Sequence, residues 1–142
     1  MTAANETRLR VWQQQPDSFF DEATIDADGT MYRTDGECKE GMDISDKGMW
    51  GYHPLVLTLA QTGEVLYLTN RSGNRPSHEG AAVRLDQALD LCRRAGFRKI
   101  KFRGDTEFSQ SRQLDRWDSA GVQFVFGFDS QPNLVKLSDS LA

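Results

Sequence analysis

Cysteine is scarce in this sequence: 142 residues contain only Cys38 and Cys92, and these do not form a Cys-x-x-Cys pair. Their wide separation excludes a sequence-evident zinc site, gives little support to a disulfide framework and makes a reducing compartment the default. A run of about 18 apolar residues is also missing, so no transmembrane helix is expected. Residues 1–6 have neither the basic start nor the apolar stretch of a secretory signal.

An excess of positive charge is lacking as well. The 17 Lys and Arg residues are outnumbered by 21 Asp and Glu residues, for a net charge of −4, which argues mildly against nucleic-acid binding. The distribution is more informative, because nine of the 17 basic residues lie between Arg71 and Arg103, whereas acids concentrate in the N-terminal third. A basic middle segment beside an acidic site suits a phosphate-rich ligand held next to metal ions. Solvated helix and strand faces are the alternative explanation.

The chain is long enough for one domain with a modest core. Hydrophobic periodicity and turn residues predict its elements. Strands are expected at 22–28, 49–60, 64–70, 97–103 and 122–128, and helices at 7–15, 79–95, 109–120 and from 133 onward. Residues 31–47 show no clear period and are interpreted as a loop.

This order predicts an α/β fold with a mixed sheet and flanking helices. Three antiparallel strands followed by helix-linked parallel strands is the order of an RNase H-like fold. In that fold the first and fourth strands are neighbours. Acidic residues at the ends of these two strands, Asp28 and Asp105, would then lie side by side.

Two neighbouring carboxylates repel each other unless a cation lies between them. Mg²⁺ prefers oxygen ligands and keeps some of its waters, so a pair of carboxylates and a substrate phosphate could hold it. Such a layout suits phosphodiester chemistry. An Asp at a strand end is more often a cap or turn residue, and Asp26 competes with Asp28 for the first position.

Four short motifs occur in an order and spacing that resemble the DDE group 1 family of bacterial insertion-sequence transposases. Each motif is weak alone, but the ordered set is fairly specific and covers most of the chain. The motifs are Asp28-Gly29-Thr30, Gly51-Tyr52-His53-Pro54-Leu55, Asn70-Arg71-Ser72-Gly73-Asn74 and Arg103-Gly104-Asp105-Thr106-Glu107-Phe108.

The resemblance implies an N-terminal helix and linker at 1–20, and a partial catalytic domain at 21–142. It implies metal-dependent hydrolysis and strand transfer at transposon ends, with Asp28 and Asp105 as catalytic ligands of Mg²⁺ or Mn²⁺. The partners would be transposon-end and target DNA, with a second copy of the chain or a full-length transposase. A bacterial, nucleoid-associated cytoplasmic location and no membrane contact follow from the same resemblance.

The third acid of the family, a Glu in a late helix, has no counterpart here. We therefore expect a fragment whose fold is incomplete at the C-terminus and which is inactive alone. A non-catalytic remnant that binds DNA or full-length transposase is an alternative. Another RNase H-like enzyme, such as a nuclease or resolvase, is a second one.

The loop before the 79–95 helix is the predicted DNA contact. Arg71, Asn74 and Arg75 would touch phosphate there, and a simple surface loop is the alternative. His53 and His78 are more readily explained by packing and by a capping or solvent role.

Overall fold

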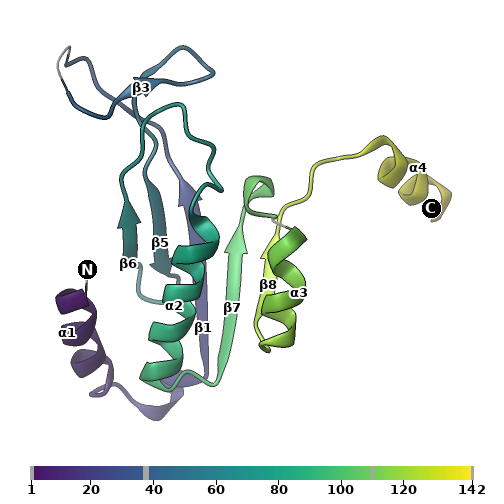
Figure 1. Cartoon of the computed structure of the whole chain (residues 1–142). Helices are drawn as coiled ribbons and strands as arrows, with labels where there is room; N and C mark the ends of the chain where they lie inside the picture. The colour runs from purple at the N-terminus through teal and green to yellow at the C-terminus, as the bar shows by residue number, and fades with distance from the viewer. Residues whose placement is uncertain (1, 37–38, 110, 142) are drawn as a thin grey trace.

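The computed structural model describes residues 2–36, 39–109 and 111–141, and it consists of two sheets and several helices (Figure 1). The larger sheet has five strands in the order β6-β5-β1-β7-β8, and the smaller has three in the order β2-β4-β3. The strands are β1 (Glu22–Gly29), β2 (Tyr32–Arg33), β3 (Asp43–Ile44), β4 (Trp50–Tyr52), β5 (Leu55–Leu59), β6 (Glu64–Thr69), β7 (Lys99–Gly104) and β8 (Gln123–Phe126). The α-helices are α1 (Thr2–Trp12), α2 (Ala81–Ala95), α3 (Ser111–Ser119) and α4 (Pro132–Leu141), and the 3₁₀ turns are η1 (Asp17–Phe20) and η2 (Thr106–Phe108).

The five-stranded sheet has the predicted RNase H-like topology. Strand β1 lies at its centre, antiparallel to β5 on one side and parallel to β7 on the other. Strand β6 continues the antiparallel part and β8 the parallel part. The first long strand is therefore the neighbour of the first helix-linked strand, as expected.

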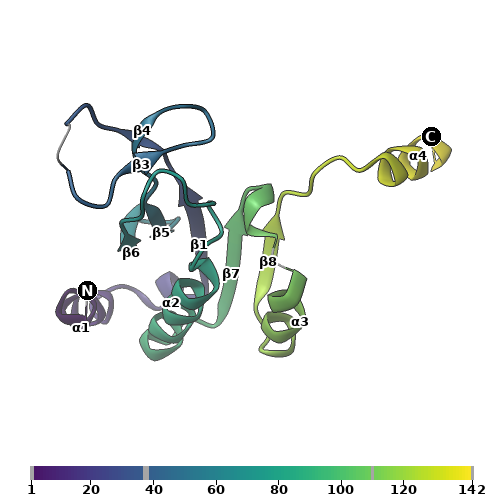
Figure 2. The same ribbon diagram turned by 45° about the horizontal axis from the view of Figure 1, so that its top comes forward.

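Helices α1, α2 and α3 cover one face of this sheet (Figure 2). Alternate β1 residues point into this layer, where Ala23 and Ile25 are fully buried. Trp117 of α3 packs edge-on against Phe102 of β7, with ring centroids 5.0 Å apart. Cys92 of α2 is buried as predicted, and burial raises the pKa of its thiol to about 12. Cys38 lies outside the described residues.

Helix α1 begins earlier and ends earlier than predicted, and it packs into the same core as the rest of the chain. Leu9 is largely buried and Trp12 is only 2% exposed. The indole Nε1 of Trp12 donates to a Glu64 carboxylate oxygen at 2.9 Å, which ties the helix to the β5–β6 hairpin.

The segment predicted as a loop, 31–47, contains β2 and β3, which pair with β4. The prediction of one strand over 49–60 was also wrong, because β4 and β5 are separated at His53 and Pro54. Proline has no N–H to donate to a sheet, which explains the break. The small sheet lies beyond the end of β1 that carries Asp28 (Figure 1).

Helix α2 begins after Gly80, two residues later than the predicted start at 79. It ends at Gly96, whose φ of 100° is a left-handed conformation that glycine adopts without strain. Helix α4 forms where a late helix was predicted, but it buries none of its described residues and stands apart from the sheet (Figure 1). Among the described residues, no helix is both long and apolar enough to cross a membrane.

Candidate active site

Asp28 and Asp105 lie at the same edge of the sheet, at the ends of two neighbouring parallel strands. Asp26 of β1 is the register partner of Arg103 of β7. Asp28 comes two residues after Asp26 and lies within β1, and Asp105 comes two residues after Arg103 and lies directly after β7. Because strand residues alternate between faces, Asp26 and Asp28 share the face opposite the buried Ala27.

Each of these two carboxylates is exposed and is oriented by a neighbour two residues away. Asp28 Oδ2 accepts a hydrogen bond from the Thr30 hydroxyl at 3.0 Å. Asp105 Oδ1 accepts one from the Glu107 backbone N–H at 3.0 Å and thereby caps η2. Within the described part of the chain, neither carboxylate forms an ion pair with Lys or Arg. Each therefore keeps an oxygen available for a cation.

Asp26 is engaged in a different way. The Arg103 guanidinium donates to both of its oxygens, from Nε at 2.6 Å and from Nη2 at 2.7 Å. This two-point contact raises the pKa of Arg103 and occupies the oxygens that a metal ion would need. The geometry therefore favours Asp28 over Asp26 as the first acid of the site.

A cleft of about 620 Å³ lies beside Asp105 and Glu107. Its other wall includes Lys47, Arg75 and His78, from the small-sheet segment and the loop before α2. Acidic and basic groups thus face the same space, as the separation of charges along the sequence suggested. Hydrogen bonding by Ser77 lowers the pKa of Glu107, against the opposing effect of desolvation.

A complete metal cage is not formed by this part of the chain. Across residues 2–36, 39–109 and 111–141, no three His, Cys, Asp or Glu side chains group closely enough to hold a metal ion. The carboxylate pair could supply a partial oxygen ligand set, to which waters and a substrate phosphate would add.

The predicted DNA-contact loop contains three residues that differ in what they touch. Arg71 Nε donates to the His53 carbonyl at 2.8 Å. Its Nη1 donates to the carbonyls of three loop residues at 2.7–3.0 Å, namely Pro76, Ser77 and Glu79. Burial lowers the pKa of this guanidinium. Arg71 therefore holds the loop together, and the structure directs its donors inward.

The other two loop residues are more open. Asn74 donates to an Asp43 carboxylate oxygen at 2.7 Å. Arg75 makes one long ion pair with Glu79 at 3.3 Å, and its side chain stays 55% exposed. Of the three residues, Arg75 is therefore the best placed to meet a phosphate, and its DNA contact stays a prediction.

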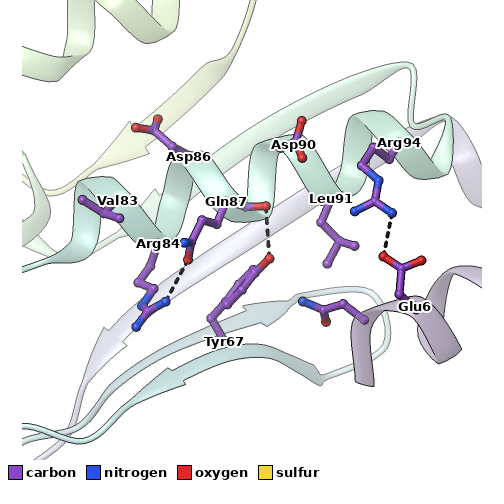
Figure 3. Close-up of a pocket in the computed structure, with 10 residues that line it drawn as sticks. Glu6, Tyr67, Val83, Arg84, Asp86, Gln87, Asp90, Leu91 and Arg94 are labelled. Atoms are coloured by element: carbon purple, nitrogen blue, oxygen red, sulfur yellow. Dashed lines mark hydrogen bonds and ion pairs between the residues drawn. The ribbon is translucent and has the colours of Figure 1, made fainter. Parts of the chain in front are cut away.

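A second pocket, of about 460 Å³, lies between α1, β6 and α2 (Figure 3), and neither Asp28 nor Asp105 lines it. Its two arginines are already engaged: Arg94 contacts Glu6 at 2.7 Å, and Arg84 donates to Gln87 at 2.8 Å. The Tyr67 hydroxyl donates to the Gln87 carbonyl at 3.3 Å (Figure 3). We interpret this pocket as the packing boundary between α1, α2 and β6, whose polar side chains contact one another there.

Two further residues at the aspartate edge, Ser77 and Glu107, contact each other, and sequence reasoning did not predict this contact. The Ser77 backbone N–H donates to a Glu107 carboxylate oxygen at 3.0 Å, although the residues are 30 positions apart. The short spacing between Asp105 and Glu107 was visible in the sequence, but it gave no sign of this long-range contact.

Comparison with known proteins gives a family and several solved structures, among them two complexes of the Mos1 transposase. No curated protein matches the chain. The Mos1 transposase paired-end complex with left transposon end is 15% identical, with a TM-score of 0.39, over 96% of this chain and 52% of that one. The Mos1 strand transfer complex is 14% identical, with a TM-score of 0.41, over 97% of this chain and 46% of that one. The chain thus spans about half the length of these transposase chains.

The family match also covers nearly the whole chain. Residues 4–142 match the transposase DDE domain group 1 family. The matched range includes both aspartates, the loop before α2 and every strand of the two sheets. The resemblance seen in the four sequence motifs is confirmed, and the chain belongs to the transposase DDE domain group 1 family.

Proposed function

We propose that this chain forms the part of a DNA transposase that holds catalytic divalent metal, with Asp28 and Asp105 as ligands. The observation that carries the proposal is their placement at the ends of adjacent parallel strands, in a chain of the DDE family. Both side chains are exposed, and in the described residues neither is neutralised by a basic side chain.

The donor set fits Mg²⁺ or Mn²⁺. Carboxylate oxygens are the ligands that these ions prefer, and an open edge leaves room for water and phosphate oxygens. A bound ion there would act as a Lewis acid toward a phosphodiester and its attacking oxygen. Thr30 and the Glu107 N–H would keep the two carboxylates oriented, and Arg75 would contact the DNA backbone.

The proposed reaction has two steps at a transposon end. A water oxygen attacks the phosphorus, and the bond from phosphorus to the 3′ oxygen breaks, which leaves a 3′-hydroxyl. That hydroxyl then attacks a phosphorus of the target DNA. The bond from this phosphorus to its own 3′ oxygen breaks and leaves a 3′-hydroxyl on the target strand, and the transposon end becomes joined to the target. The family uses three acids, but no three acidic, His or Cys side chains of the described residues group closely enough to hold a metal ion. We therefore expect no cleavage by the chain alone.

Metal binding tests the ligand assignment directly. Mn²⁺ titration followed by electron paramagnetic resonance should show binding to the chain. Asp28→Asn and Asp105→Asn should each weaken it by at least about 10-fold, because each removes a charged oxygen ligand. Asp26→Asn is the control and should bind Mn²⁺ like the unaltered chain. Loss of binding in Asp26→Asn alone would show that the wrong aspartate was chosen.

Complementation tests the reaction. The chain is joined to a segment that carries the late-helix Glu of a full-length family member and is given transposon-end and target DNA with Mg²⁺. Nicking followed by joining supports the transposase function. Cleavage without joining would favour a nuclease or resolvase, and no cleavage at all would favour a non-catalytic remnant.

A further inference from the structure

Ser77 is a buried polar residue at the point where the two aspartate-bearing strand ends meet the loop before α2. It is 4% exposed, although it lies outside any helix or strand. It does not cap α2, which begins four residues later with Gly80 as its N-cap. Ser77 is therefore buried by contacts other than those of a helix cap.

On one side, Ser77 packs against the residue that follows Asp28. A Cβ atom placed on Gly29 would lie 2.9 Å from both Cβ and Oγ of Ser77, and 3.1 Å from Nε2 of His53. Such distances are too short for ordinary packing, so only glycine permits the loop to approach β1 this closely.

On the other side, Ser77 is bonded to the turn that carries Asp105. Its backbone N–H donates to the Glu107 carboxylate at 3.0 Å. The Glu107 N–H in turn donates to Asp105 Oδ1, also at 3.0 Å. A continuous path of contacts thus runs from Asp105 through Glu107 and Ser77 to Gly29, next to Asp28.

The loop before α2 is fixed by hydrogen bonds around Ser77, so a shift of this residue would also shift its neighbours. His53 Nδ1 lies 2.7 Å from the Arg75 carbonyl, so it donates there, and Nε2 is left to accept from the Ser77 hydroxyl at 3.4 Å. Arg71 donates to the Ser77 carbonyl at 2.9 Å. The backbone N–H, the carbonyl and the hydroxyl of Ser77 are therefore all engaged.

We propose that Glu107 is a positioning residue that sets the separation of the Asp28 and Asp105 carboxylates through Ser77. Two carboxylates repel each other, so without a fixed link the exposed turn after β7 would move away from β1. Glu107 supplies that link by accepting from the Ser77 N–H while its own N–H orients Asp105. This inference rests on the proposed function, because it concerns the same two aspartates.

The test compares Glu107→Ala with Glu107→Gln, and Glu40→Ala is the control because Glu40 is exposed and its side chain has no partner among the described residues. Two quantities are measured: amide hydrogen exchange of Ser77, and Mn²⁺ affinity by electron paramagnetic resonance. Exchange elsewhere in the five-stranded sheet reports whether each variant folds.

Glu107→Ala should speed Ser77 exchange by roughly 3–10-fold, as expected for the loss of one hydrogen bond. It should weaken Mn²⁺ binding by about 10-fold or more, which is typical when a group that orients a metal ligand is removed. Glu107→Gln keeps an oxygen acceptor for the Ser77 N–H and should restore both quantities to within about threefold. Gly29→Ala places a methyl group against Ser77 and should displace the loop from the side of β1. It should weaken Mn²⁺ binding although both aspartates are still present in the chain.

Unchanged Mn²⁺ affinity in Glu107→Ala, with loss of binding in Asp105→Asn, would overturn the positioning role and leave the proposed function intact. A loss in Glu107→Gln as large as that in Asp105→Asn would also overturn it, because Glu107 would then be a ligand itself. If Asp28→Asn and Asp105→Asn both bind Mn²⁺ normally, the proposed function fails and the positioning role fails with it.

Discussion

Two arginines in the loop before α2 are alike in the sequence and opposite in the structure. Arg71 donates to backbone carbonyls of His53, Pro76, Ser77 and Glu79. The Arg75 side chain stays 55% exposed. Carbonyls that lose a buried donor remain without a partner, whereas an exposed guanidinium can be removed with little effect on folding. Arg71 should therefore contribute to the stability of the fold, and Arg75 to DNA binding.

We predict that Arg71→Ala lowers the free energy of unfolding by about 2–3 kcal/mol, because it removes charged hydrogen bonds to four carbonyls, of which those to His53 and Ser77 are partly buried. Arg75→Ala is the matched control and should change stability by less than about 0.5 kcal/mol. In DNA titrations, Arg75→Ala should instead reduce the slope of log affinity against log salt by about 1, as expected for one phosphate contact. Urea denaturation measures the first effect, and equal stability of the two variants would contradict it.

At the scale of secondary-structure elements, the first and last helices of the described chain differ in their packing. Helix α1 inserts Trp12 into the core, where its ring lies edge-on to Phe97 with centroids 5.4 Å apart. Helix α4 has apolar side chains, including Leu134 and Leu137, but these stay more than 40% exposed. In proteins most helical stability comes from packing of an apolar face, so the two helices should differ in what they add to stability.

Trp12→Ala should therefore lower the free energy of unfolding by about 3–5 kcal/mol, the usual effect of emptying a large aromatic site in a core. Removal of residues 132–142 should change it by less than about 0.5 kcal/mol, because no described side chain of α4 is buried. Thermal and urea unfolding of the two variants measure both effects. A large loss of stability on removing α4 would show that this helix packs on the domain in solution.

At the scale of the whole molecule, ion pairs join β1 and β7 across the sheet face that α1, α2 and α3 do not cover. Lys101 Nζ contacts Glu22 at 2.8 Å, and Arg103 contacts Asp26 at 2.6 Å. The strongest influence on Glu22 is the hydrogen bond from Lys101, which lowers the pKa of its carboxyl below the ordinary value of 4.5. The pairing of these central strands is therefore linked to pH.

A lowered carboxyl pKa adds stability at pH values above the pKa of the unfolded chain, and this stability is lost as the pH falls through the folded pKa. The urea midpoint of the chain should accordingly decrease as the pH falls below about 4.5. Glu22→Gln should have a lower midpoint at neutral pH and a shallower decrease in acid. The same decrease in both proteins would show that Glu22 does not contribute. Glu40→Gln provides an exposed control.

Local patterns predicted most of the fold but not the small sheet. Alternation marked β1 and β7, and Gly96 marked the end of α2, because these signals depend on residues a few positions apart. Strands β2 and β3 have two residues each and lie in a polar segment, so no period could reveal them. They exist because β4 pairs with both of them.

By itself, the sequence determined which segments form strands and helices, and that Asp28 and Asp105 follow the motifs of a DDE family, because periodicity and motifs are properties of neighbouring residues. Only the tertiary structure showed that Arg103, far along the chain, donates to both oxygens of Asp26, which supports the proposal of Asp28 as the metal ligand. It alone showed that Arg71 is directed into its own loop and that Ser77 contacts Glu107. Such contacts form only when the backbone folds and brings the residues together. The spacing of residues along the chain does not predict them.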